Sequence, residues 1–214
     1  GGHGTKASPA PPPSVKGEVS TSARSVGAHA EHLQSSSWRA DISCDTCHKV
    51  PVKLLDKGHI DTALPAEVIF AKVAVASGAK PQWSGTTCSG SYCHGATLSG
   101  GTITSPVWTK VDGSQDKCGT CHSLPPSKNH TPSKQCSTCH KGVVDSSMKI
   151  IAPSKHINGK VDVSSACNAC HGGAANAAPP KSLAGGRATT LPQVGAHQAH
   201  LTTSSWRPKA VCGD

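Results

Sequence analysis

Apolar residues in this chain occur in short runs that proline and glycine interrupt, so no long helix or strand is predicted. The clearest helical pattern runs from Gly27 to Ser35, with Ser25 as a candidate N-cap. The most apolar stretch, Ala66 to Gly78, contains Glu67 and Lys72, and its short apolar pieces fit a strand as well as a helix. No segment reaches the roughly 18 apolar residues of a membrane span. We expect mostly coil with short helices and few or no strands.

The composition leaves little material for an ordinary hydrophobic core. The 214 residues include four Trp, one Tyr, one Phe and one Met, against 22 Gly and 16 Pro. Such side chains cannot fill a protein interior of the usual kind. Without a cofactor, a chain of this composition is expected to be partly disordered.

A motif of two closely spaced cysteines followed directly by histidine occurs five times. Four copies have the form CxxCH, and the second copy has four residues between its cysteines. The motif is the attachment signature of c-type haem, in which two thiols bond the porphyrin and the histidine binds the iron. The cysteines are Cys44 and Cys47, Cys88 and Cys93, Cys118 and Cys121, Cys136 and Cys139, and Cys167 and Cys170; the histidines are His48, His94, His122, His140 and His171.

Paired cysteines also occur in zinc sites and disulfide scaffolds, and these are the alternatives. Neither requires a histidine after each pair, and only 13 of the 214 residues are histidine. The stretched copy, Cys88 to His94, is the least standard of the five. We therefore predict five covalent haems c that replace the missing side-chain core, which makes folding dependent on their attachment.

The chain carries a formal charge of +9. A basic chain can indicate a nucleic-acid or membrane partner. Here the two propionates of every haem would offset the charge, and no dense run of Lys or Arg is present. We expect no nucleic-acid partner.

The chain contains an internal repeat with a period of 168 residues. Residues 27–39 align without a gap to residues 195–207, and nine of the 13 positions are identical. The pattern predicts one full unit and the start of a second. The expected parts are a Pro/Ala/Ser-rich linker from a preceding repeat (1–26), a pentahaem module (27–172), a linker (173–194) and the start of the next repeat (195–214).

Cys212 occupies the position of Cys44 in the second copy and is the first cysteine of a partial motif. His3 occupies the position of His171. We expect the chain to come from a longer tandem array. A sixth haem, shared between the ends of neighbouring chains in a polymer, is a further hypothesis.

Five histidines per repeat remain after the motif histidines, which suggests that every iron has two histidine ligands. Two of them are spaced i, i+3 on the predicted helix, so they share one face and should bind two different haems. A zinc pair or a solvent-exposed helix is the alternative for these two. Which histidine serves which iron stays open, and Met148 is the alternative axial ligand. The predicted distal ligands are His29, His32, His59, His130 and His156.

These motifs resemble the CxxxxCH/CxxCH repeat domain of large multihaem c-type cytochromes of metal-reducing bacteria. The segments that carry the resemblance are 27–33, 58–61, 92–95, 106–108 and 156–159. The resemblance implies a haem-cored multihaem cytochrome c that is exported and moves respiratory electrons across the cell envelope. Some such cytochromes polymerise into extracellular wires.

Three functions follow as hypotheses. The first is electron transfer through closely packed bis-histidine haems, without enzymatic activity. The second is a multihaem reductase, which needs an open haem site. The third extends the first and makes the repeat a subunit of a conductive filament. The expected partners are other redox proteins and extracellular acceptors, together with self-association. The expected location is extracellular or on the outer cell surface, with the periplasm as the alternative.

Overall fold

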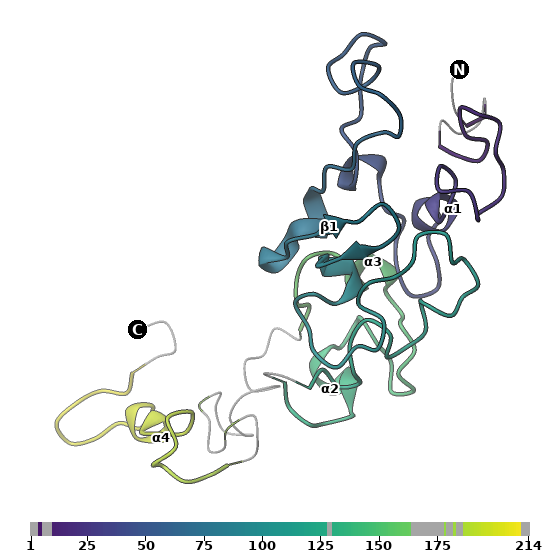
Figure 1. The fold of residues 1–214 in the computed structure, drawn as a ribbon. Helices are drawn as coiled ribbons and strands as arrows, with labels where there is room; N and C mark the ends of the chain where they lie inside the picture. Colours follow the sequence, from purple (N-terminus) through teal and green to yellow (C-terminus); the bar gives the residue numbers. More distant parts are fainter. Residues whose placement is uncertain are drawn as a thin grey trace.

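The computed structural model describes residues 4–5, 10–127, 130–163, 178, 182 and 186–210. Its helices and strands are short and are joined by long irregular segments (Figure 1). This confirms the expectation of mostly coil with few strands. The elements are α1 (His29–Leu33), η1 (Cys44–Thr46), η2 (Lys72–Gly78), β1 (Gln82–Trp83), β2 (Cys88–Ser89), η3 (Tyr92–His94), α2 (Cys136–Cys139), α3 (Pro153–His156) and α4 (His197–His200).

The strands β1 and β2 pair antiparallel, with Gln82 opposite Ser89 and Trp83 opposite Cys88. An isolated bridge between Thr87 and Val107 brings a later segment to this pair. The small sheet therefore fixes the start of the second cysteine motif against residues near 107.

The apolar stretch 66–78 divides into an extended part and a 3-10 helix. Its first part forms no helix or strand, but the amide of Ile69 donates to the carbonyl of Cys47 and that of Ala71 to the carbonyl of Thr46. The second part is η2, which is kinked at Ala76 and Ser77. The extended part thus lies along the first cysteine motif, and tertiary hydrogen bonds decide a conformation that the apolar pattern left open.

The predicted N-cap of the first helix is wrong. Helix α1 begins two residues later than expected, its N-cap is Ala28, and no side chain caps it. Ser25 instead donates its hydroxyl to the carboxylate of Glu18. The intervening Gly27 has φ +44, a left-handed conformation that separates Ser25 from the helix.

The described residues contain little buried apolar material. The buried hydrophobic residues are all Ala or Val: Val26, Ala74, Val143, Val144, Ala178 and Val194. Many larger apolar side chains are exposed, including Leu55 at 82% and Val52 at 92%. The polypeptide by itself therefore builds no core of the size expected for a domain of this length.

The local structure recurs with the period of 168 residues. Both Gly27 and Gly195 have φ +44, and Arg39 and Arg207 lie over the preceding tryptophan ring at 5.6 and 5.5 Å. In each copy a downstream amide donates to the carbonyl of the second helix histidine, His32 or His200. The segment with α4 lies apart from the main body in Figure 1. Similar local sequence thus adopts similar local structure; the proposed domain boundaries remain predictions.

No helix within the described ranges is long and apolar enough to cross a bilayer.

Candidate haem-binding sites

Four of the five cysteine motifs lie within the described residues, and short helices or turns carry them. The first starts in η1, the second ends in η3, and the fourth forms α2. The third lies in a turn, where the amide of Thr120 donates to the carbonyl of Lys117. We name these motifs site 1 (Cys44, Cys47, His48), site 2 (Cys88, Cys93, His94), site 3 (Cys118, Cys121, His122) and site 4 (Cys136, Cys139, His140).

Each motif histidine faces one of the predicted distal histidines. The ring centres are 6.1 to 6.4 Å apart in all four cases. His29 and His32, both on α1, face the motif histidines of two different sites. The pairs are His48 with His29 at site 1, His94 with His32 at site 2, His122 with His156 at site 3, and His140 with His130 at site 4.

This separation fits two imidazoles on opposite sides of one metal ion. Two metal–nitrogen bonds of about 2 Å and two ring radii of about 1.1 Å place the ring centres roughly 6 Å apart. In the described ranges no three His, Cys, Asp or Glu side chains converge on a possible metal position. A zinc site needs three or four such ligands, whereas haem iron needs only two because the porphyrin supplies the rest. Among the described residues, the donor set therefore fits haem better than zinc.

The ring nitrogens are oriented for metal binding. In seven of the eight paired histidines, Nδ1 lies 2.6 to 2.9 Å from a backbone carbonyl oxygen. A carbonyl only accepts, so Nδ1 carries the proton and Nε2 keeps its lone pair. Such a second hydrogen bond accompanies nearly all metal-binding histidines, because it fixes both tautomer and orientation.

Burial favours the neutral, ligating form of several of these rings. It lowers the pKa of His29, His32 and His156. The pKa of His94 falls to about 4, through burial first and then the positive charges of His32 and Arg39. A neutral imidazole is the form that binds a metal.

The attachment cysteines of site 2 lie in similarly apolar surroundings. Burial raises the pKa of Cys88 and Cys93 to about 11. No two of the eight described motif cysteines form a disulfide with each other. The disulfide alternative therefore finds no support among these eight cysteines.

A cavity of about 50 Å³ lies at site 2. Both ligands, His32 and His94, line it together with Cys93, Trp38 and Arg39. Cys121 of site 3 lines the same cavity. The residues of the second motif, its facing histidine and a cysteine of the third motif thus line one common cavity.

Sites 1 and 2 are neighbours because α1 carries both the histidine that faces site 1 and the histidine that faces site 2. Sites 2 and 3 are neighbours because Gly95, directly after His94, packs against the carbonyl of Cys121. Its φ of +83 and the overlap that a Cβ would make with this carbonyl both require glycine. The amide of Ser123 further donates to the carbonyl of Ser99.

One short segment supports both site 3 and site 4. His156 ends α3, and its ring faces that of His122 in site 3. Six residues later, the carbonyl of Asp162 accepts the Nδ1 proton of His140 in site 4 at 2.7 Å. The four sites therefore follow one another in space in the order in which they occur in the sequence.

Some predicted residues have no assigned place in these pairs. Cys167, Cys170, His171 and Cys212 lie outside the described residues. His59 donates from Nδ1 to the carbonyl of Leu54 at 2.8 Å, like the paired histidines. Its role as a distal ligand stays a prediction. Met148, the alternative axial ligand, is 54% exposed.

Two tryptophans belong to the sites although the motifs did not assign them. Trp108 contacts the rings of both His29 and His32. The carbonyl of Trp38 accepts the Nδ1 proton of His156 from 118 positions away. The scarcity of aromatic residues and the recurrence of Trp38 as Trp206 were signals that could have pointed to them.

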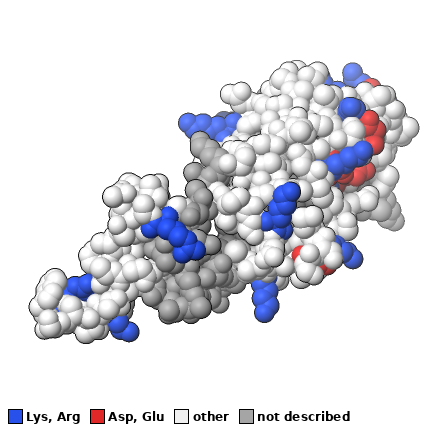
Figure 2. Space-filling view, turned by 90° about the horizontal axis from the view of Figure 1, so that it is seen from below, with Lys and Arg blue, Asp and Glu red and all other residues white. Residues whose placement is uncertain are grey.

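Basic side chains outnumber their acidic partners in the described part of the chain. Two ion pairs are present there, Lys72 with Asp45 at 2.5 Å and Lys110 with Asp112 at 3.9 Å. Figure 2 shows Lys and Arg as separate patches over one face rather than as one continuous basic surface. This distribution matches dispersed anionic groups better than a nucleic-acid backbone.

Residues 87–122, which contain sites 2 and 3, match the family model of the Geobacter CxxxxCH...CXXCH motif. The resemblance expected from the sequence is thereby confirmed over this segment. The CxxCH motifs indicate covalently bound c-type haem, and hence a cytochrome of the c type. Comparison with curated proteins and with solved structures gave no significant match.

Proposed function

We propose that this chain is a multihaem cytochrome c that transfers electrons along a row of bis-histidine haems, which also form its core. The observation that carries the proposal is the set of four histidine pairs with ring centres 6.1 to 6.4 Å apart. When bound, the haems supply the one-electron redox centres. Two imidazoles per iron leave no position for a substrate, so the residues present favour electron transfer over reduction of a substrate.

The polypeptide contributes by fixing ligands and spacing. Backbone carbonyls orient the imidazoles, and the i, i+3 spacing on α1 holds two neighbouring sites together. Gly95 allows site 2 to approach site 3 closely. Because electron tunnelling falls steeply with distance, such close spacing is what a conducting series needs.

Dispersed lysines and arginines are proposed to compensate the haem propionates. The chain has 21 Lys and Arg against 12 Asp and Glu. The excess positive charge is comparable to the negative charge that five haems bring.

Absorption spectroscopy and carbon monoxide binding test the proposed function. We expect low-spin ferric spectra, no binding of carbon monoxide to the reduced protein, and an intact mass that corresponds to five covalent haems. A substantial high-spin fraction that binds carbon monoxide in the native protein would instead support the reductase hypothesis.

A location outside the cytoplasm and assembly into a filament are also proposed. Covalent haem and the 11 cysteines favour export, and the repeat with a period of 168 residues favours an array. Light scattering of the purified protein tests assembly; a monodisperse monomer at high concentration would contradict it.

A further inference from the structure

We propose that Trp108 is a positioning residue that sets the ring orientation of both distal ligands on α1, and that it thereby gives sites 1 and 2 different electronic structures. The proposal rests on the haem ligation proposed above. It concerns a residue outside the cysteine motifs and a property that the identity of the ligands does not determine, namely the angle between the two imidazole planes.

The indole of Trp108 contacts both ligands at once. Its ring centre lies 4.8 Å from that of His29 in an edge-on arrangement of 87°, and 5.6 Å from that of His32 at 32°. Aromatic rings at these distances prefer defined mutual angles. The last side-chain torsion of a histidine has only broad minima, so the Nδ1 hydrogen bonds of His29 and His32 anchor one edge of each ring but still leave its plane some rotation. A fixed indole beside it therefore limits its orientation.

Trp108 is itself held from several directions. Its Nε1 donates to the carbonyl of Arg24 at 2.8 Å, and its amide donates to the carbonyl of Thr86 at 2.9 Å. The ring of Trp83 packs edge-on against it at 6.2 Å. An added Cβ at Gly27 would overlap the indole, so the close approach to the start of α1 needs glycine there.

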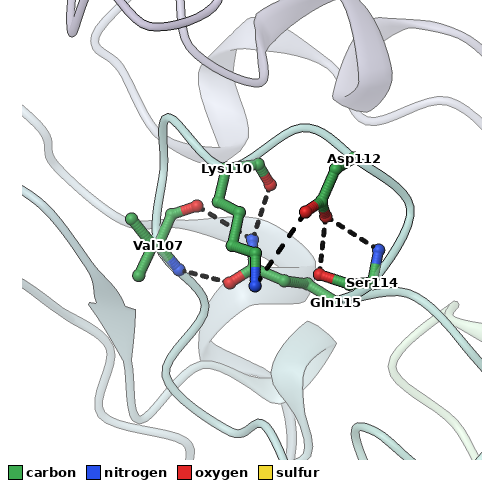
Figure 3. Close-up of polar contacts among 5 residues, drawn as sticks. All are labelled: Val107, Lys110, Asp112, Ser114 and Gln115. Carbon is green, nitrogen blue, oxygen red and sulfur yellow. Dashed lines mark hydrogen bonds and ion pairs between the residues drawn. The ribbon is translucent and has the colours of Figure 1, made fainter.

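The loop that follows Trp108 fixes its neighbour Val107 (Figure 3). The side-chain amide of Gln115 accepts from the amide of Val107 at 2.8 Å and donates to its carbonyl at 2.9 Å. It also donates to the carbonyl of Lys110 at 2.8 Å. Asp112 accepts from the amide of Ser114 within the same loop. The tryptophan is thus attached to a closed, hydrogen-bonded loop.

The consequence is a difference between neighbouring sites. The imidazole planes of His29 and His48 are close to parallel, at 22°, whereas those of His32 and His94 are close to perpendicular, at 73°. The angle between axial imidazole planes determines how far the iron dxz and dyz orbitals split. It therefore determines the g anisotropy of a low-spin ferric haem, and it contributes to the reduction potential.

The other two sites provide an internal reference, because Trp108 has no ring contact with their histidines. The planes are at 73° in site 3 and at 9° in site 4. The oxidised protein should therefore show two classes of signal in electron paramagnetic resonance. Near-parallel ligands give rhombic spectra, and near-perpendicular ligands give a single feature at high g.

The test compares two Trp108 variants with the control Trp206→Leu. Trp108→Leu removes the aromatic ring, whereas Trp108→Phe keeps a smaller aromatic ring but removes the Nε1 hydrogen bond to the carbonyl of Arg24. Trp206 is 80% exposed. Haem content is measured for each variant by the pyridine haemochrome assay. We expect both Trp108 variants to alter the rhombic and the high-g signals while retaining all haems, with the larger change in Trp108→Leu. The control should match the native spectrum.

Unchanged spectra and potentials in both Trp108 variants at full haem content would overturn the proposal and leave Trp108 a packing residue. Should Trp108→Leu lose haem, Trp108→Phe decides the question, because it keeps an aromatic ring in place. A native spectrum without low-spin signals would instead refute the proposed bis-histidine ligation itself.

Discussion

His156→Ala removes the distal ligand that we propose for site 3. The ring of His156 lies 6.4 Å from that of His122, and its Nδ1 donates to the carbonyl of Trp38 at 2.8 Å. Alanine cannot reach the iron, so one of the five proposed haems should become five-coordinate. About one fifth of the haem iron should turn high-spin, and the reduced protein should bind one carbon monoxide per chain. Leaving the carbonyl of Trp38 without its donor should cost roughly 1–3 kcal/mol in the free energy of unfolding.

Absorption and magnetic circular dichroism measure the high-spin fraction, and titration with carbon monoxide counts the open sites. Added imidazole should restore the low-spin spectrum, because it can replace the missing ligand. Lys155→Ala is the matched control: Lys155 is exposed, lies directly beside His156 in α3 and belongs to none of the four pairs. If His156→Ala retains five haems, stays fully low-spin and binds no carbon monoxide, the assignment of His156 to site 3 is wrong.

Three other changes test the architecture. Gly95→Ala should lower the free energy of unfolding, because its Cβ would overlap the carbonyl of Cys121. The loss should exceed the roughly 1–2 kcal/mol that a left-handed conformation costs a residue with a side chain. Gly78→Ala is the control: its φ is a similar +78 but its Cβ meets open space, so the difference between the two variants in denaturant unfolding measures the overlap alone. The double variant Cys44→Ala/Cys47→Ala should lack one haem by intact mass while keeping the other attachments, and a mass equal to the native one would contradict site 1. The chain produced without haem attachment should give a circular dichroism spectrum of unfolded protein, because the buried apolar residues in its described part are only Ala and Val. Cooperative thermal unfolding of such a sample would refute the haem-cored fold.

Local sequence rules correctly predicted those features that depend on residues close together in the sequence. The i, i+3 spacing of His29 and His32 predicts that both lie on one helix face, and in the structure both lie on α1 and face the motif histidines of two different sites. The repeated residues around Trp38 and Trp206 adopt the same local hydrogen bonds. The N-cap at Ser25 failed because Gly27 takes a left-handed φ, which a capping pattern does not reveal.

The pairing of ligands could not be predicted in this way. His122 pairs with His156, whose Nδ1 proton goes to Trp38, a residue 118 positions earlier. The position of Trp108 between two ligands likewise depends on the loop closed by Gln115. Contacts of this range are set by packing, and a chain rich in glycine and proline has no regular periodicity that would forecast them.

The sequence by itself determined the cofactor chemistry, the number of attachment motifs and the predominance of coil, because cysteine spacing, the adjoining histidine and composition are local properties of the chain. Only the tertiary structure decided which distal histidine faces which motif histidine, the angle between their rings and the order of the four described sites. The physical reason is that two imidazoles meet across an iron only where separate segments of the chain converge, and convergence depends on the packing of the whole module.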